Sequence, residues 1–232
     1  MLLGIQTDTQ DISGTVLEQK ETSDLTEEMV LECIKSYIGE YDQMPPMYSA
    51  LKVNGKKLYE LAREGKVVER KTRKVMIHSI EVQEIELPRV RMTVKCSKGT
   101  YIRTLCHDIG NSLGTGACME KLLRTKVSRF ELKNSLRLSE IEEFKANGRL
   151  MEIILPVDEI FTDYPALTVN SEQARLAYNG NPLKQEEFTQ IYDGYVRVYD
   201  EAHRFIGIYR ADHKKKLYRL EKMFLDEEEL RG

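Results

Sequence analysis

The sequence predicts an α+β protein with a mixed, mainly antiparallel sheet, flanking helices and a small β-rich domain at its C-terminal end. Apolar and polar residues alternate in two runs within residues 74–96, broken by a turn at Pro88, as in two paired antiparallel strands. Apolar residues recur at helical spacing over 25–38 and 103–113. Short strand-like runs with turns follow residue 160. We therefore expect two domains, residues 1–160 and 161–232.

The first helix and the segment after it are marked by local signals. Asp24-Leu-Thr-Glu27 resembles a capping box, and Gly39 is a suitable C-terminal stop. Together they predict an amphipathic helix of about four turns. The next segment, 44–48, contains two consecutive prolines, which exclude a helix and predict an extended chain.

The elements after residue 50 follow from turn residues and periodicity. Asn54-Gly55 predicts a hairpin turn, and residues 58–63 predict a short helix. The remaining predicted elements are the strand pair of 74–96, a helix over 103–113, a strand over 122–132, short helices over 139–148 and 172–178, and strands over 195–199, 205–210 and 217–220.

Charge is distributed unevenly along the chain. Residues 1–48 carry 2 basic and 10 acidic side chains, residues 49–130 carry 18 and 8, and residues 131–232 carry 15 and 20. The net charges of −8, +10 and −5 add up to the −3 of the whole chain. A basic centre between acidic flanks indicates a polyanionic partner.

Several classes of site and location are disfavoured by the residue pattern. Cys96, Cys106, His107 and Cys118 match no zinc-ligand spacing, so we expect buried thiols and no metal. No run of about 18 apolar residues occurs, which predicts no membrane span. Widely spaced cysteines without a C-x-x-C motif indicate a reduced, cytoplasmic setting.

A basic stretch with interleaved aromatics lies in the central segment. Cations with aromatic rings between them suit a phosphate backbone and unstacked bases. A lysine-rich solvated loop is the alternative interpretation. The basic residues are Lys52, Lys56, Lys57, Arg63, Lys66, Arg70, Lys71, Arg73 and Lys74, and the tyrosines are Tyr48 and Tyr59.

Tyr101 and Arg103 lie two residues apart at the predicted seam between a strand and a helix, in "CSKGTYIRTLCHDIG" (96–110). A guanidinium presents a planar fork of donors to a carboxylate or phosphate; a structural ion pair is the alternative. If the turn is extended, residues two apart point the same way and the two side chains share a pocket.

Four blocks of this sequence resemble the TruB family of bacterial tRNA pseudouridine synthases, in the family's order. The resemblance is strong over about residues 1–160 and weaker over the C-terminal module, which is similar to the family's PUA-like RNA-binding domain. The blocks are "QTDTQDISG" (6–14), "MPPMYSALKVNGKKLYELAREG" (44–65), "CSKGTYIRTLCHDIG" (96–110) and "LLRTKVSRF" (122–130).

The resemblance implies a reaction without metal or organic cofactor. Uridine-55 of the T-loop leaves the stack, its N1–C1′ bond breaks, and the base rejoins through C5. Tyr101 would handle the C5 proton, and Arg103 would pair with a nucleophilic Asp. Other residues implied in substrate binding are Asp11 near the pocket, Tyr48 at the root of the basic arm (about 49–74), Lys52, Lys56 and Lys57 in that arm, Leu122 on the target base, and Arg124.

The family's nucleophile lies in a G-x-L-D motif upstream of the T-D-T-x-D block, and residues 1–232 contain no such motif. Asp8 and Asp11 match the block and not the nucleophile. The resemblance thus implies a chain that lacks roughly the family's first quarter and does not turn over alone. A fragment, a misassigned start and a degenerate copy all stay open.

Three functional hypotheses follow. The first is a synthase by family, with the T-arm of tRNA as partner. The second is a catalytically dead tRNA-binding module or RNA chaperone. The third is a purely structural protein. We expect a monomer in the full-length form. For the truncated chain we expect self-association through apolar surface and an unpaired edge near residues 1–6.

Overall fold

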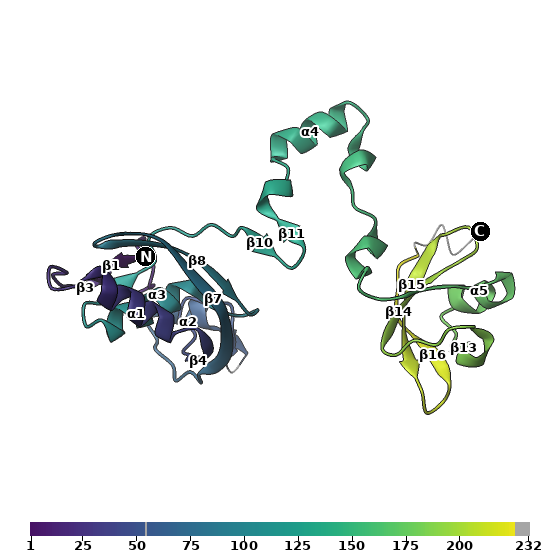
Figure 1. The fold of residues 1–232 in the computed structure, drawn as a ribbon, viewed down its shortest axis with the longest axis horizontal. Coiled ribbons are helices and arrows are strands. Elements are labelled where there is room, and N and C mark those ends of the chain that lie inside the picture. The colour runs from purple at the N-terminus through teal and green to yellow at the C-terminus, as the bar shows by residue number, and fades with distance from the viewer. Residues whose placement is uncertain (54, 226–232) are drawn as a thin grey trace. The chain divides into compact units, whose positions relative to one another are not determined.

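The two long strands predicted over residues 74–96 are β7 (Arg73–Glu86) and β8 (Arg89–Cys96), which pair antiparallel and form the centre of a sheet (Figure 1). The sheet has five strands in the order β4-β7-β8-β1-β9, all antiparallel. The outer members are β4 (Gly39–Gln43), β1 (Leu2–Leu3) and β9 (Ala117–Cys118). The predicted fold class is confirmed for this part of the chain.

The computed structural model describes residues 1–53 and 55–225. It divides the chain into two compact units, Met1–Lys133 and Asn134–Gly232. Within the described ranges no helix is long and apolar enough to cross a bilayer.

Two helices complete the core of the first unit. α1 (Glu27–Ser36) buries Val30 and Ile34, and α3 (Ile102–Ser112) buries Leu105 and Ile109 in the same cluster. The predicted first helix is confirmed, but at ten residues it is shorter than the four turns expected, and Thr26 caps it, not Asp24. Its hydroxyl accepts a hydrogen bond from the Met29 N–H at 3.3 Å. Because both helices share the core with the sheet, the residues at their ends are held firmly.

The N-terminal residues are not an edge, so that prediction is wrong for residues 2–3. Leu2 pairs with Arg89 of β8 on one side and with Cys118 of β9 on the other. The Met1 amino group donates a buried hydrogen bond to the Val90 carbonyl at 2.9 Å. A strand with two neighbours has no free ladder groups to offer another chain.

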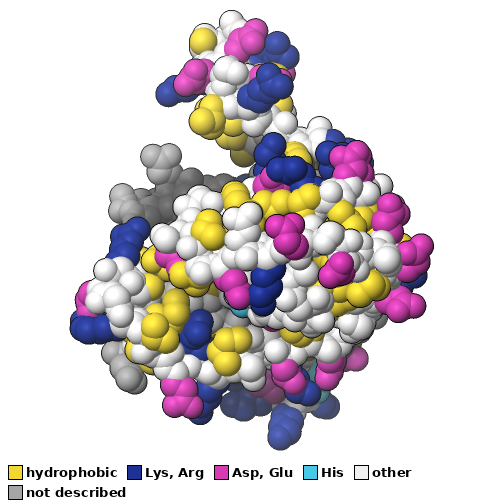
Figure 2. Space-filling view, turned by 90° about the vertical axis from the view of Figure 1, so that its left-hand side faces the viewer, with side chains coloured by type: hydrophobic (Ala, Val, Ile, Leu, Met, Phe, Trp, Pro, Cys, Tyr) yellow, Lys and Arg dark blue, Asp and Glu magenta, His cyan; other side chains and the backbone are white. Residues whose placement is uncertain are grey.

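A two-stranded ribbon follows β1. β2 (Ile5–Thr7) pairs with β3 (Val16–Gln19), whose residues are all exposed. Hydrophobic side chains reach the surface of this unit between charged ones (Figure 2). Val16 and Leu17 of β3 are among the exposed apolar residues.

The basic arm is an excursion between β4 and β7. β5 (Lys52–Val53) and β6 (Lys56–Lys57) pair as a hairpin, and α2 (Leu58–Arg63) follows. The predicted hairpin and helix are confirmed, although Asn54 itself lies outside the described residues.

The continuous strand predicted over 122–132 is wrong. Only β10 (Lys126–Val127) and β11 (Phe130–Glu131) form, as a hairpin that continues into η1 (Leu132–Asn134). Ser128 has φ +52°, a left-handed conformation that breaks the strand and turns the chain back.

The second unit contains a β domain with its own core. Its sheet has the order β12-β14-β15-β16-β13, with β12 parallel to β14. The strands are β12 (Ala166–Thr168), β13 (Leu183–Lys184), β14 (Tyr195–Tyr199), β15 (Phe205–Asp212) and β16 (Leu217–Met223), and the helices are α5 (Ser171–Tyr178) and η4 (Gln185–Glu187).

The stretch before this β domain has no buried residues in its helices, which are α4 (Leu138–Ala146), η2 (Leu150–Ile153) and η3 (Val157–Phe161). The core begins at Leu167. We therefore propose a domain boundary near residue 160, at the start of the β domain. The division by compactness lies earlier, between Lys133 and Asn134.

Candidate active site

Tyr101 lies at the N-cap of α3, with extended backbone angles of φ −98° and ψ 105°. The turn that leads to it is fixed by its own side chains. Ser97 Oγ accepts from the Met76 N–H at 2.9 Å, and Thr100 Oγ1 donates to the Ser97 carbonyl at 2.9 Å. Gly99 supplies the left-handed residue of this turn, with φ +88°.

The helix begins at Ile102, so Arg103 is already in its first turn. The interpretation of an extended chain from Tyr101 to Arg103 is therefore wrong. The two side chains leave the backbone from different conformations, one extended and one helical. Strand alternation therefore does not apply to them, and they are neighbours only along the start of the helix.

Gln43 brackets the peptide of Tyr101. Its side-chain Oε1 accepts from the Tyr101 N–H at 2.7 Å, and its Nε2 donates to the Tyr101 carbonyl at 3.0 Å. Gln43 is 1% exposed. The sequence-based interpretation missed this residue; the signal available was a polar side chain immediately before the Met44–Tyr48 segment.

Asp11 lies in a tight loop of hydrogen bonds. Its Oδ1 accepts from the Ser13 N–H at 3.0 Å and from the Ser13 hydroxyl at 2.7 Å. Asp8 Oδ1 accepts from the Thr15 N–H at 2.8 Å across the same loop. A Cβ on Gly14 would lie 2.2 Å from Thr9 Oγ1, so the loop closes only around a glycine.

The charge of Arg103 reaches Asp11. Partial burial raises the pKa of the Asp11 carboxyl, but the two hydrogen bonds from Ser13 and the positive charge of Arg103 outweigh it and lower the pKa below its usual value. Arg103 forms no ion pair or side-chain hydrogen bond with any residue in the described part of the chain. Its guanidinium is therefore open to a further partner.

A second contact ties this loop to α3. Thr104 is buried, and its hydroxyl donates to Gln10 Oε1 at 2.7 Å. Gln10 has φ +61°, and its carbonyl accepts from the Met119 N–H at 3.0 Å. The structure therefore brings the Asp11 loop to the helix start that carries Tyr101 and Arg103.

The predicted arm residues are exposed or half-buried and lie in the segment between β4 and β7. Lys52 pairs with Lys57 across the hairpin. Lys57 Nζ donates to the Tyr59 hydroxyl at 3.2 Å, and Arg63 lies over the same ring at 5.4 Å. The Tyr59 hydrogen bond raises the pKa of Lys57. Lys56 and Tyr48 complete the predicted set, and Tyr48 is half-buried at the root of the arm.

Leu122 and Arg124 follow Met119 in an irregular segment. Leu122 is 55% exposed, and Arg124 is also exposed. Met119 pairs with the Asp11 loop through its backbone, so this segment leaves the sheet beside that loop. No contact brings Leu122 or Arg124 onto Tyr101 or Arg103 in the residues that the structure describes.

The cysteines are free thiols. Cys106 and Cys118 are buried, as predicted, whereas Cys96 is half-buried, and burial raises the pKa of Cys106 to about 11. Such a thiol stays protonated at neutral pH and is a poor metal ligand. Within residues 1–53 and 55–225, no group of three His, Cys, Asp or Glu side chains could hold a metal ion.

Three family models match this chain in sequence order. Residues 1–102 match the N-terminal domain of the TruB family pseudouridylate synthases. Residues 103–162 match the C-terminal domain of tRNA pseudouridylate synthase B, and residues 165–218 match the C-terminal part of pseudouridine synthase II TruB.

Curated relatives agree with these matches. The tRNA pseudouridine synthase B of Lachnoclostridium phytofermentans is 50% identical over an alignment of 206 residues, which covers 83% of this chain and 67% of that protein. The protein of the same name from Clostridium kluyveri is 42% identical over 225 residues, 96% of this chain and 75% of that one.

Solved structures show the same fold at lower identity. A chain of a Cbf5-Nop10-Gar1 complex has a TM-score of 0.65 at 23% identity, covering 90% of this chain and 65% of that chain. A chain of an H/ACA RNP bound to a substrate RNA containing 2′-deoxyuridine has a TM-score of 0.64 at 21% identity, covering 89% and 64%.

Proposed function

The chain belongs to the TruB family of pseudouridine synthases, and we propose that its reaction is the isomerisation of uridine-55 in the T-loop of tRNA. The target base is flipped out of the stack. Its N1–C1′ bond breaks, the base turns over, and a C5–C1′ bond forms. The proton on C5 is removed, and N1 is left carrying a proton.

We assign the roles from the helix start outward. Tyr101 handles the C5 proton, and Arg103 pairs with the nucleophilic aspartate. The observation that carries this assignment is the guanidinium of Arg103, which has no ion-pair partner in the described residues while its charge reaches Asp11. Such a cation suits a carboxylate that reacts with the sugar.

The arm and its neighbours supply substrate binding. Lys52, Lys56 and Lys57 meet T-arm phosphates, which an arm of exposed cations suits. Tyr48 lies where the arm leaves the sheet and contacts RNA there. Asp11 lines the pocket, and Leu122 and Arg124 close over the target base when RNA is bound.

We also propose that residues 1–232 alone give no turnover, because the G-x-L-D aspartate is not among them. The partner is the T-arm stem-loop, and the setting is the cytoplasm. A form that also carried the upstream segment would be a monomer. Residues 1–232 alone self-associate through exposed apolar residues such as Val16 and Leu17. Sedimentation of the 232-residue chain at several concentrations tests this last point.

A catalytically dead tRNA-binding module is the second candidate. It is favoured by one observation: the basic arm is folded as a braced hairpin and helix within this chain. Binding of RNA by such a module needs no nucleophile.

The two candidates are separated by tritium release from a T-arm hairpin labelled at C5 of its target uridine. We expect no release above background from residues 1–232. Joining them to an upstream segment that carries the G-x-L-D motif should then give turnover, and a hairpin with cytidine at the target position is the control.

Turnover by residues 1–232 alone would overturn the nucleophile assignment. Binding of the hairpin by both proteins, with no turnover by either, would favour the RNA-binding module. Absence of binding by both would remove both candidates.

A further inference from the structure

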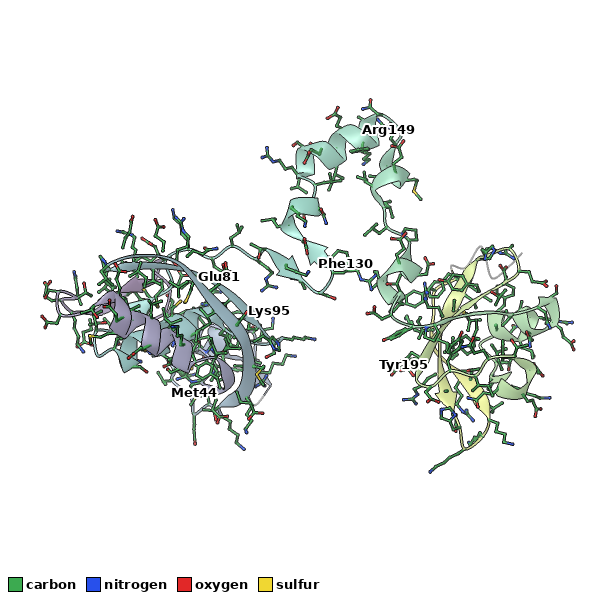
Figure 3. All side chains as sticks on the ribbon, viewed as in Figure 1. Met44, Glu81, Lys95, Phe130, Arg149 and Tyr195 are labelled. Carbon is green, nitrogen blue, oxygen red and sulfur yellow. The ribbon has the colours of Figure 1, made fainter. Side chains whose placement is uncertain are left out.

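Gln43 occupies the base of the RNA-binding arm. It is the last residue of β4 and pairs with Arg73, the first residue of β7. The arm therefore leaves the sheet immediately after Gln43 and returns to it opposite the same residue. Met44, the first residue outside β4, is labelled in Figure 3.

The same side chain forms hydrogen bonds with both backbone groups of Tyr101, its N–H and its carbonyl, 58 residues away. Its Oε1 accepts from the Tyr101 N–H at 2.7 Å, and its Nε2 donates to the Tyr101 carbonyl at 3.0 Å. Gln43 is 1% exposed. A buried primary amide needs hydrogen-bond partners for its oxygen and its nitrogen, and here the backbone N–H and C=O of one residue serve both.

A second contact stiffens the base of the arm. Arg70 Nη1 donates to the Pro45 carbonyl at 2.9 Å, across the two chain segments that enter and leave the arm. The hydrogen bond between Arg70 and Pro45 therefore links the two chain segments that lie next to Gln43 at the base of the arm. On the other side of Gln43 lies the N-cap of α3, which is Tyr101 itself.

We propose that Gln43 is a positioning residue that couples the arm's hold on RNA to the placement of Tyr101. RNA that orders the base of the arm also orders Gln43, and through two hydrogen bonds it orders the residue that handles the C5 proton. The inference rests on the proposed function for the role of Tyr101, whereas the amide contact stands without it.

The test uses three variants of the 232-residue chain. Gln43→Met keeps an unbranched side chain of similar length and removes both hydrogen bonds. Gln43→Glu keeps an acceptor and, when ionised, loses the donor. Gln83→Met is the matched control, because Gln83 is an exposed β7 glutamine that donates to Thr93 Oγ1 at 3.0 Å. Thermal unfolding followed by circular dichroism checks that each variant folds.

The first readout is hydrogen exchange at the Tyr101 amide without RNA. We expect Gln43→Met to speed it about five- to tenfold, the effect of one lost hydrogen bond, with β8 amides and the Gln83→Met protein unchanged. Unchanged exchange at Tyr101 would overturn the contact. If Gln43→Met does not fold, Gln43→Glu tests the contact instead. As the pH is lowered, the introduced carboxyl is protonated and regains a hydrogen-bond donor, so the NMR signals of Tyr101 should return toward those of the wild-type chain.

The second readout is the response to a T-arm hairpin. In the wild-type chain, saturating hairpin should slow exchange at Tyr101 severalfold further. In Gln43→Met the hairpin should bind within about twofold of the wild-type Kd without this slowing, since the arm's phosphate contacts remain. Equal slowing in both proteins would overturn the coupling. Failure of the wild-type chain to bind the hairpin would instead count against the proposed function.

Catalysis gives a third readout, in the protein made by joining residues 1–232 to an upstream segment with the G-x-L-D motif. We expect Gln43→Met to lower kcat about 10- to 100-fold with the KM for the hairpin nearly unchanged, as for a misplaced catalytic group. A rise in KM with unchanged kcat would show that Gln43 serves RNA binding alone and would overturn the positioning role.

Discussion

Gly110 sets how closely α3 approaches the sheet, and replacing it with alanine should be destabilising. An ideal Cβ at this position would lie 2.2 Å from the Ala117 backbone N and 2.3 Å from the Gly116 carbonyl carbon. Ordinary contact begins at 3.4 Å, so the two backbones would have to separate by about 1.2 Å, the difference between 3.4 and 2.2 Å.

The magnitude follows from two opposing terms. Alanine is a better helix former than glycine by about 1 kcal/mol. Forcing an extra methyl into a packed interface costs about 1–3 kcal/mol, and more when the neighbour is backbone that cannot rotate away. Because the clashing atoms here are backbone, the upper end of the cost applies, and we expect Gly110→Ala to lower the free energy of unfolding by about 2 kcal/mol and to speed exchange of amides in α3 and β9.

Urea unfolding followed by far-UV circular dichroism measures this change, since the chain has no tryptophan. The control is Gly99→Ala, where nothing lies within 4 Å but φ is +88°. It should cost about 1–2 kcal/mol of backbone strain without changing β9 exchange. Adding Ala117→Gly should not rescue Gly110→Ala, because the clashing backbone atoms remain. A Gly110→Ala protein as stable as wild type, or more so, would refute the close-approach reasoning.

Two further predictions concern charge. In the second unit, burial raises the pKa of the Asp200 carboxyl, but hydrogen bonds from the Tyr178 hydroxyl and from the Arg204 N–H and Nε outweigh it and lower the pKa from 3.8 to about 2. The lowered pKa corresponds to roughly 2 kcal/mol of stability, which is present above pH 4 and is lost as the pH falls through about 2. Asp200→Asn should lower stability at pH 7 and show no difference near pH 2, by urea unfolding at both values; an equal loss at both would contradict the linkage. In the arm, the double variant Lys52→Ala, Lys56→Ala should reduce the slope of log affinity against log salt for a T-arm hairpin by about 1.5. The control double variant Lys35→Ala, Lys145→Ala should leave this slope unchanged. Equal slopes for the arm variant and the wild-type chain would show that the arm does not contact RNA phosphates.

Local patterns predicted the long elements of this fold. Alternation over residues 74–96 marked β7 and β8, and helical spacing marked α1 and α3 to within one or two residues at most ends. In these elements the side-chain period matches the burial that the fold imposes, so the sequence carries the information by itself.

The short strands could not be predicted in this way. β1 and β9 have two residues each and exist because each finds a partner far along the chain. Two residues show no period. The predicted unpaired edge near residue 1 failed for this reason, and the predicted strand over 122–132 failed because Ser128 takes a left-handed conformation that its residue type does not announce.

The candidate site was half visible in the sequence. Tyr101, Arg103 and Asp11 stand in recognisable blocks, and the structure places Arg103 where its charge reaches Asp11. Gln43 was invisible as a partner of Tyr101, because a contact between residues 58 apart depends on how β4 meets the start of α3. Pairings of this kind follow from topology and not from local pattern.

The helix that carries the site is held at both of its ends. At its start Gln43 fixes the peptide of Tyr101, and near its end Gly110 lies against the backbone of Gly116 and Ala117. Arg103 is the second residue of the helix, so its backbone belongs to a rigid element and not to a loop. Its guanidinium has no ion-pair partner among residues 1–53 and 55–225, so its position does not depend on a salt bridge that a substrate would have to break. In the proposed reaction the backbone of Arg103 is therefore set before the carboxylate arrives, and no ion pair among the described residues has to be broken when the two side chains meet.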